Sequence, residues 1–189
     1  MLHSHSDSDL HDAPRFSKII LLHGKGGSPN GSVLQIEQSL HALGVALAME
    51  RWRMPHSDPD SLAERSVDYL AANPPDANAL VIGISLGGTV ACRLQEIHPT
   101  APHVIAISSP TWADGVRVER RVPNRISIFG THDDVIAGRT SDWPALADTF
   151  EFAWLTHDTD AHKLRLARMI AAYVNGGASA LRSAAQAGR

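Results

Sequence analysis

A serine flanked by glycines, Ser85, occurs in the segment GISLGG at residues 83–88. A serine hydroxyl is a weak nucleophile unless it is exposed, has a base beside it and lies close to donors for the oxyanion. A tight turn from a strand into a helix exposes such a serine, and small residues two positions away on either side let the flanking backbone approach. Because an apolar run precedes Ser85 and a segment of helical period follows it, the pattern predicts a nucleophile.

A glycine-rich segment, LLHGKGGS at residues 21–28, ends the first apolar run of the chain. Such a loop can turn a backbone N–H toward Ser85 and supply half of an oxyanion hole, with the N–H of Leu86 as the other half. A structural turn and a nucleotide-binding loop are the alternatives. Pro29 stands where the Rossmann fingerprint requires its third glycine, although Glu50 could take the place of the ribose-binding acid.

Candidates for the acid and the base follow the last two apolar runs. Asp133 and Asp134 are adjacent, and a carboxylate at either position could orient a histidine and stabilise its charged form. His157 and His162 lie in the segment THDTDAH, and either could be the general base. We interpret His132 and the remaining histidines as surface or packing residues.

The elements that must position these residues are six short apolar runs, at 18–23, 44–49, 79–84, 103–107, 125–129 and 150–155. Most are continuous, as in strands covered on both faces, and segments of helical period separate them. Two pairs, Ser32 with Gln35 and Ser61 with Glu64, match the capping box and predict helix starts. The pattern predicts an α/β three-layer sandwich: a six-stranded, mostly parallel sheet with helices on both faces and a site at the carboxyl ends of the strands.

The order Ser85, Asp133, His162 resembles the nucleophile–acid–base order of the α/β-hydrolase superfamily, over roughly residues 17–175. The spacing of Gly130, Asp133 and two following aliphatic residues matches the family's acid pattern, which favours Asp133 over Asp134. The family's catalytic histidine lies just before the last helix, which favours His162 over His157.

In this family the residue after the His-Gly pair of the first loop donates its N–H to the oxyanion. That position is Lys25 here, with Gly26 as the fallback. The chain resembles the small, lidless serine hydrolases of the superfamily, without the first two strands and without a cap domain. The resemblance implies a Ser-His-Asp triad that cleaves a carboxylic ester, or a thioester or amide, through an acyl-enzyme, with no cofactor and no metal.

Composition sets the remaining expectations for the 189 residues, of which 43% are hydrophobic. The formal charge of −3 does not suggest a nucleic-acid partner, and no apolar run is long enough for a membrane helix. The single cysteine, Cys92, and the absence of a hydrophobic centre in the first dozen residues suggest a soluble, cytoplasmic protein. We expect a mobile polar tail over 1–15, one domain over 16–175 and a C-terminal extension over 176–189.

A binding or interaction protein with the same fold is the competing hypothesis. Trp112 and Trp143 could provide contact surfaces for a partner or a substrate. Four arginines could bind carboxylates or belong to a solvated loop: Arg117, Arg120, Arg121 and Arg125. No segment of the sequence specifies the acyl or the alcohol group of an ester.

Overall fold

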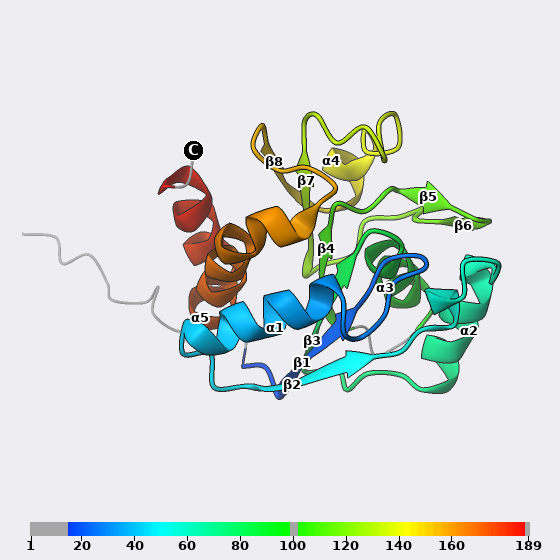
Figure 1. The fold of residues 1–189 in the computed structure, drawn as a ribbon, viewed down its shortest axis with the longest axis horizontal. Coiled ribbons are helices and arrows are strands. Elements are labelled where there is room, and N and C mark those ends of the chain that lie inside the picture. Colours follow the sequence, from blue (N-terminus) through cyan, green and yellow to red (C-terminus); the bar gives the residue numbers. More distant parts are fainter. Residues whose placement is uncertain (1–14, 99–101, 188–189) are drawn as a thin grey trace, which may run out of the picture.

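Six parallel strands form the central sheet of this computed structural model, which describes residues 15–98 and 102–187. Their order across the sheet is β2-β1-β3-β4-β7-β8 (Figure 1). In chain order they are β1 (Lys18–Leu22), β2 (Ala48–Trp52), β3 (Ala79–Ile84), β4 (His103–Ile107), β7 (Arg125–Gly130) and β8 (Asp148–Phe152). Because all neighbouring pairs are parallel, the carboxyl ends of the six strands share one edge of the sheet.

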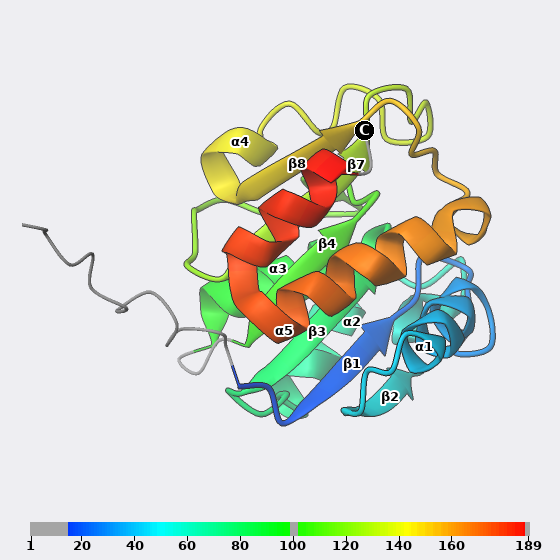
Figure 2. The same ribbon diagram turned by 90° about the vertical axis from the view of Figure 1, so that its left-hand side faces the viewer.

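Helices cover both faces of the sheet and complete the predicted three layers. One face carries α1 (Ser32–Ala42) and α5 (Lys163–Ala187), which cross in front of the strands in Figure 2. The other face carries α2 (Ala63–Ala72), α3 (Leu86–Ile97) and the short α4 (Trp143–Leu146). Successive strand residues enter opposite core layers: in β1, Ile19 packs with α1 and α5, and Ile20 packs with α2 and α3. This alternation explains why the strands are continuously apolar.

The second and sixth strands are displaced from their predicted positions. The run expected at 44–49 gives way to β2 at Ala48–Trp52, because Gly44 has a positive φ of 78° and the N–H of Val45 still bonds to Leu40 at the end of α1. The edge strand β2 is only partly buried, so its sequence is more polar than the apolar run beside it. The run expected at 150–155 begins earlier, at Asp148, and its buried Leu155 lies beyond the end of β8.

The two predicted capping boxes are wrong. Helix α1 begins at Ser32 itself with Gly31 as its N-cap, and α2 begins after Leu62, with no side-chain cap at either helix. A turn precedes each helix instead: the Gly31 N–H donates to the Ser28 carbonyl, and the Ser61 N–H donates to the Asp58 carbonyl.

A two-stranded hairpin, β5 (Trp112–Ala113) with β6 (Val116–Arg117), follows β4 and was not predicted. Its turn residues Asp114 and Gly115 both have positive φ, 49° and 85°. An Asp-Gly pair with two positive φ angles is typical of a type I′ hairpin turn, so the dipeptide was a usable signal. The hairpin contacts the glycine-rich loop after β1 through an ion pair of 2.5 Å between Lys25 Nζ and Asp114.

The last helix continues through the segment that was expected to be an extension. Non-helical angles at Gly176 and Gly177 kink α5, and its second half returns to the sheet. Leu181 and Ala185 are buried in the core there, and Arg182 bonds to Asp148 at 3.2 Å. Except for Arg15, the tail expected at residues 1–15 lies outside the described residues. Among the helices of the described ranges, none has the length and apolarity to span a membrane.

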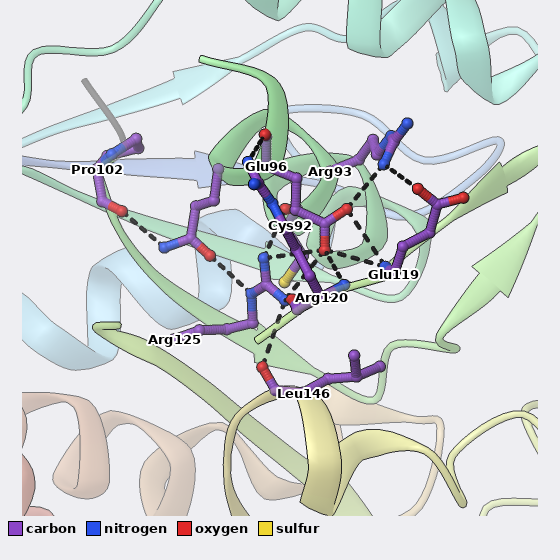
Figure 3. A network of polar contacts seen from close by, with 9 residues as sticks. Cys92, Arg93, Glu96, Pro102, Glu119, Arg120, Arg125 and Leu146 are labelled. Carbon is purple, nitrogen blue, oxygen red and sulfur yellow. Dashed lines mark hydrogen bonds and ion pairs between the residues drawn. The ribbon is translucent and has the colours of Figure 1, made fainter. Parts of the chain in front are cut away.

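A buried ionic network joins α3 to the start of β7 at the amino ends of the strands (Figure 3). The Arg125 and Glu96 side chains are 0% and 1% exposed and lie 3.4 Å apart. Arg125 also donates to Gln95 Oε1 at 2.8 Å and to the Cys92 carbonyl at 2.9 Å. Glu96 accepts the backbone N–H groups of Glu119 and Arg120, which anchors the segment after the hairpin. Arg125 is therefore a structural residue and does not present a binding surface.

Replacing Arg125 with methionine is expected to lower the free energy of unfolding by about 3–5 kcal/mol, because Glu96 then loses a buried partner and several acceptors lose their donor. Urea unfolding followed by tryptophan fluorescence measures this change. The control is Arg121→Ala, which removes a half-exposed ion pair with Asp148 and should cost at most about 1 kcal/mol. Equal losses in the two variants would contradict the structural role of Arg125.

Candidate active site

Ser85 lies in the turn between β3 and α3, where the sequence predicts the nucleophile. Its backbone angles, φ 52° and ψ −125°, belong to a region that residues with a side chain seldom occupy. Every residue from 79 to 92 is buried except Ser85, which is partly exposed. The turn thus presents the hydroxyl at the surface and at the positive end of α3, where negative charge is favoured.

Glycines on both sides of Ser85 permit this turn. A Cβ on Gly87 would lie 2.5 Å from the carbonyl oxygen of His23, and one on Gly83 would overlap the backbone of Gly88. The His23 carbonyl cannot move without displacing the end of β1, and the Gly88 backbone cannot move without displacing α3. The requirement for small residues at these positions is therefore a matter of close backbone approach.

The loop after β1 lies directly against the nucleophile. A Cβ on Gly24 would come within 3.1 Å of Ser85 Cβ, and the N–H of Gly27 closes a turn onto the Gly24 carbonyl at 3.0 Å. Within the described ranges, the backbone N–H groups of Lys25 and Leu86 donate to no protein acceptor. Unused N–H donors near a serine hydroxyl are what an oxyanion hole requires, so these two groups are candidates for one.

Of the two adjacent aspartates after β7, only Asp133 is buried; Asp134 is exposed. Asp133 Oδ2 lies 3.0 Å from His157 Nδ1, and the His157 side chain is 26% exposed. The second oxygen, Oδ1, is buried without a hydrogen-bond partner in the described part of the chain. A buried carboxylate against one imidazole nitrogen fixes the ring and leaves Nε2 free to take a proton.

The expected contact between Asp133 and His162 is wrong, because Asp133 contacts His157. His162 Nε2 lies 3.3 Å from Thr156 Oγ1, and its ring packs on Trp154 with centroids 5.3 Å apart. The intervening turn, η3 (Thr159–His162), has Asp158 as its N-cap, and the Asp158 carboxylate accepts two backbone N–H groups of the turn. Asp158 thus has a structural task, and the cap places His162 at the far end of the turn.

The path of the chain after β8 explains why His157 meets Asp133. A Cβ on Gly130 would overlap the carbonyl oxygen of Leu155, so a glycine there lets this segment cross the end of β7. The Ser108 hydroxyl, at the end of β4, donates to the Thr156 carbonyl at 3.4 Å. Because β4 neighbours β3, these contacts carry the segment before His157 toward the strand that ends at Ser85.

The Ser85 hydroxyl makes no hydrogen bond within the described ranges. The hydrogen bond between a catalytic hydroxyl and its base is often long in a structure without substrate and tightens only when substrate is bound. Cys92 is not an alternative nucleophile, because burial raises the pKa of its thiol to about 12. The thiolate is the reactive form of cysteine, and it is not populated at neutral pH.

Two buried histidines border the loop, and sequence reasoning interpreted both as packing or surface residues. His23 is 2% exposed, with Nδ1 2.8 Å from the Gly24 carbonyl, and His56 is fully buried, with Nε2 2.8 Å from the His23 carbonyl. The two residues are 33 positions apart. No local pattern could therefore have revealed their contact.

Comparisons with known proteins bear on the fold of the chain. No protein-family model matches the chain, and no curated protein matches it significantly. Among solved structures, the ydeN gene product of B. subtilis is 15% identical with a TM-score of 0.62, covering 84% of this chain and 99% of its own. Mouse alpha/beta hydrolase domain-containing protein 10 is 12% identical with a TM-score of 0.65, covering 84% and 89%. The esterase domain of a Rhodothermus marinus protein is 15% identical with a TM-score of 0.53, covering 93% and 90%.

At these identities the likeness concerns the fold, and it extends over most of this chain and of each neighbour. The six-stranded parallel sheet with helices on both faces is the architecture expected of this fold, and the structural neighbours support the same assignment. The chain has the α/β-hydrolase fold.

Proposed function

We propose that the protein is a serine hydrolase that cleaves a carboxylic ester, or a thioester or amide, of a small molecule through an acyl-enzyme. The observation that carries the proposal is the contact between buried Asp133 and His157 at the same sheet edge as the strained, partly exposed Ser85. His157 replaces His162 as the proposed base, because the orienting carboxylate lies on His157.

The proposed reaction has two halves. Ser85 Oγ attacks the ester carbonyl while His157 Nε2 takes its proton, and Asp133 stabilises the charged ring through Nδ1–H. The N–H groups of Lys25 and Leu86 bind the oxyanion. His157 then protonates the leaving alcohol, and water, activated by the same ring, releases the acid and restores Ser85.

The nucleotide-binding alternative is disfavoured by the hydrogen bonds of the glycine-rich loop. The Gly26 N–H donates to the His56 carbonyl at 2.8 Å, and the Gly27 N–H donates to Gly24. A phosphate cradle needs such N–H groups free. For the binding-protein alternative, only one of the two tryptophans can form a contact surface. Trp143 is buried and donates to the Ser109 carbonyl, whereas Trp112 is 47% exposed.

The test is hydrolysis of p-nitrophenyl esters of graded chain length by the purified protein. We expect saturable release of p-nitrophenol, with the preferred chain length reporting the acyl pocket. A folded protein that hydrolyses none of a broad ester and thioester panel would contradict the proposal and favour the binding protein. Raised thermal stability with a dinucleotide, without hydrolysis, would restore the nucleotide-binding interpretation.

A further inference from the structure

His56 holds the glycine-rich loop at two points. It lies in the short turn η2 (Pro55–Ser57) between β2 and α2 and is fully buried. Its ring nitrogen Nε2 is 2.8 Å from the His23 carbonyl, and its own carbonyl accepts the Gly26 N–H at 2.8 Å. These two bonds bracket Gly24 and Lys25, the two residues that lie between His23 and Gly26.

The hydrogen bonds define which nitrogen of each ring carries the proton. The Met54 N–H donates to His23 Nε2 at 3.1 Å, so the His23 proton lies on Nδ1 and is donated to the Gly24 carbonyl. His56 Nε2 faces a carbonyl and must donate, so its Nδ1 accepts from the Ser66 hydroxyl at 2.8 Å. Every nitrogen of the two rings thus has a partner of the correct kind.

Both rings are suited to remain neutral. Burial lowers the pKa of His56 to about 4 and also lowers the pKa of His23. A second proton on His23 would sit on Nε2 and face the Met54 N–H, which is itself a donor. The contacts therefore form one consistent network only with uncharged rings.

We propose that His56 is a positioning residue that, together with His23, fixes the backbone around Lys25 so that its N–H points to the oxyanion formed at Ser85. This inference rests on the proposed ester hydrolysis. The turn that it fixes lies against the nucleophile, since a Cβ on Gly24 would come within 3.1 Å of Ser85 Cβ. The ion pair of Lys25 with Asp114 holds the side chain of the same residue from the hairpin.

Kinetics of two His56 variants test the role. His56→Phe keeps a ring but removes the donor to His23, and it should lower kcat by about 10²-fold with KM changed less than about threefold, the size of a misplaced transition-state contact. His56→Gln retains an amide N–H near the Nε2 position and should recover most of the loss. The matched control is His103→Gln, a partly buried histidine at the amino end of β4, which should leave both constants unchanged.

A folded His56→Phe variant with a kcat within about threefold of wild type would overturn the positioning role. So would a raised KM with an unchanged kcat, because a fixed oxyanion donor acts in the transition state.

The tautomers of the wild-type protein provide a readout that needs no substrate and no variant. In ¹⁵N-labelled protein at neutral pH, NMR should find the proton on Nδ1 in His23 and on Nε2 in His56. A His56 ring that is charged, or protonated on Nδ1, refutes the contact with His23 even if esters are hydrolysed. A wild type that hydrolyses no ester refutes the proposed function and, with it, the catalytic role of His56, whichever tautomers are found.

Discussion

Replacing Ser85 with alanine is expected to lower kcat for ester hydrolysis by about 10⁶-fold, the scale on which loss of a triad serine acts. The Cys92 thiol cannot take its place, because it is fully buried and its pKa is raised to about 12. The substitution removes the attacking oxygen but keeps Cβ, so the loop around Gly24 should stay in place. Steady-state kinetics with the best p-nitrophenyl ester measure the loss.

Stability separates a chemical effect from a folding defect in this variant. Ser85 has a positive φ and its hydroxyl makes no hydrogen bond in the described residues, so alanine should change the unfolding midpoint little. A folded Ser85→Ala protein that retains more than about a tenth of wild-type kcat would assign the nucleophile elsewhere.

Replacing His157 with alanine is expected to lower kcat by about 10⁴–10⁶-fold, because it removes both the general base and the acid that protonates the leaving group. His162→Ala is the matched control, at the other histidine of the same segment, five positions along the chain. His162 bonds to Thr156 and packs on Trp154, so its loss should leave activity within about tenfold of wild type. Parallel kinetics of the two variants distinguish the candidates.

The reverse order of effects would assign the base to His162. It would also require the segment after β8 to rearrange, because Asp133 lies on His157. The Gly130 contact with Leu155 and the Ser108 bond to Thr156 oppose that rearrangement.

Local patterns predicted those parts of the site that depend on neighbouring residues. The turn at Ser85 needs a strand, a helix and small residues within five positions, and all of these can be recognised in the sequence. The place after β7 left Asp133 and Asp134 open, and the family resemblance favoured Asp133, which is the buried one of the pair. Six strands and three layers followed from the apolar runs.

Features that depend on distant contacts escaped sequence reasoning. The histidine that meets Asp133 is decided by how the chain crosses the ends of β7 and β4, through contacts 25 and 48 residues apart at Gly130–Leu155 and Ser108–Thr156. The hydrogen bond from His56 to the His23 carbonyl likewise joins residues far apart in the sequence. The start of β2 was misplaced because the first residues of the apolar run at 44–49 form the end of α1, where the Val45 N–H donates to Leu40, and the strand begins only at Ala48.

The most direct test of Ser85 as an activated nucleophile is labelling with a fluorophosphonate, followed by mass spectrometry of the digested protein. Such reagents phosphonylate a serine that a neighbouring base activates. We expect one adduct on the peptide that carries Ser85, lost in Ser85→Ala, strongly slowed in His157→Ala and retained in His162→Ala. A folded wild type that takes up no label at Ser85, or a label that persists unchanged in Ser85→Ala, would contradict this role of Ser85.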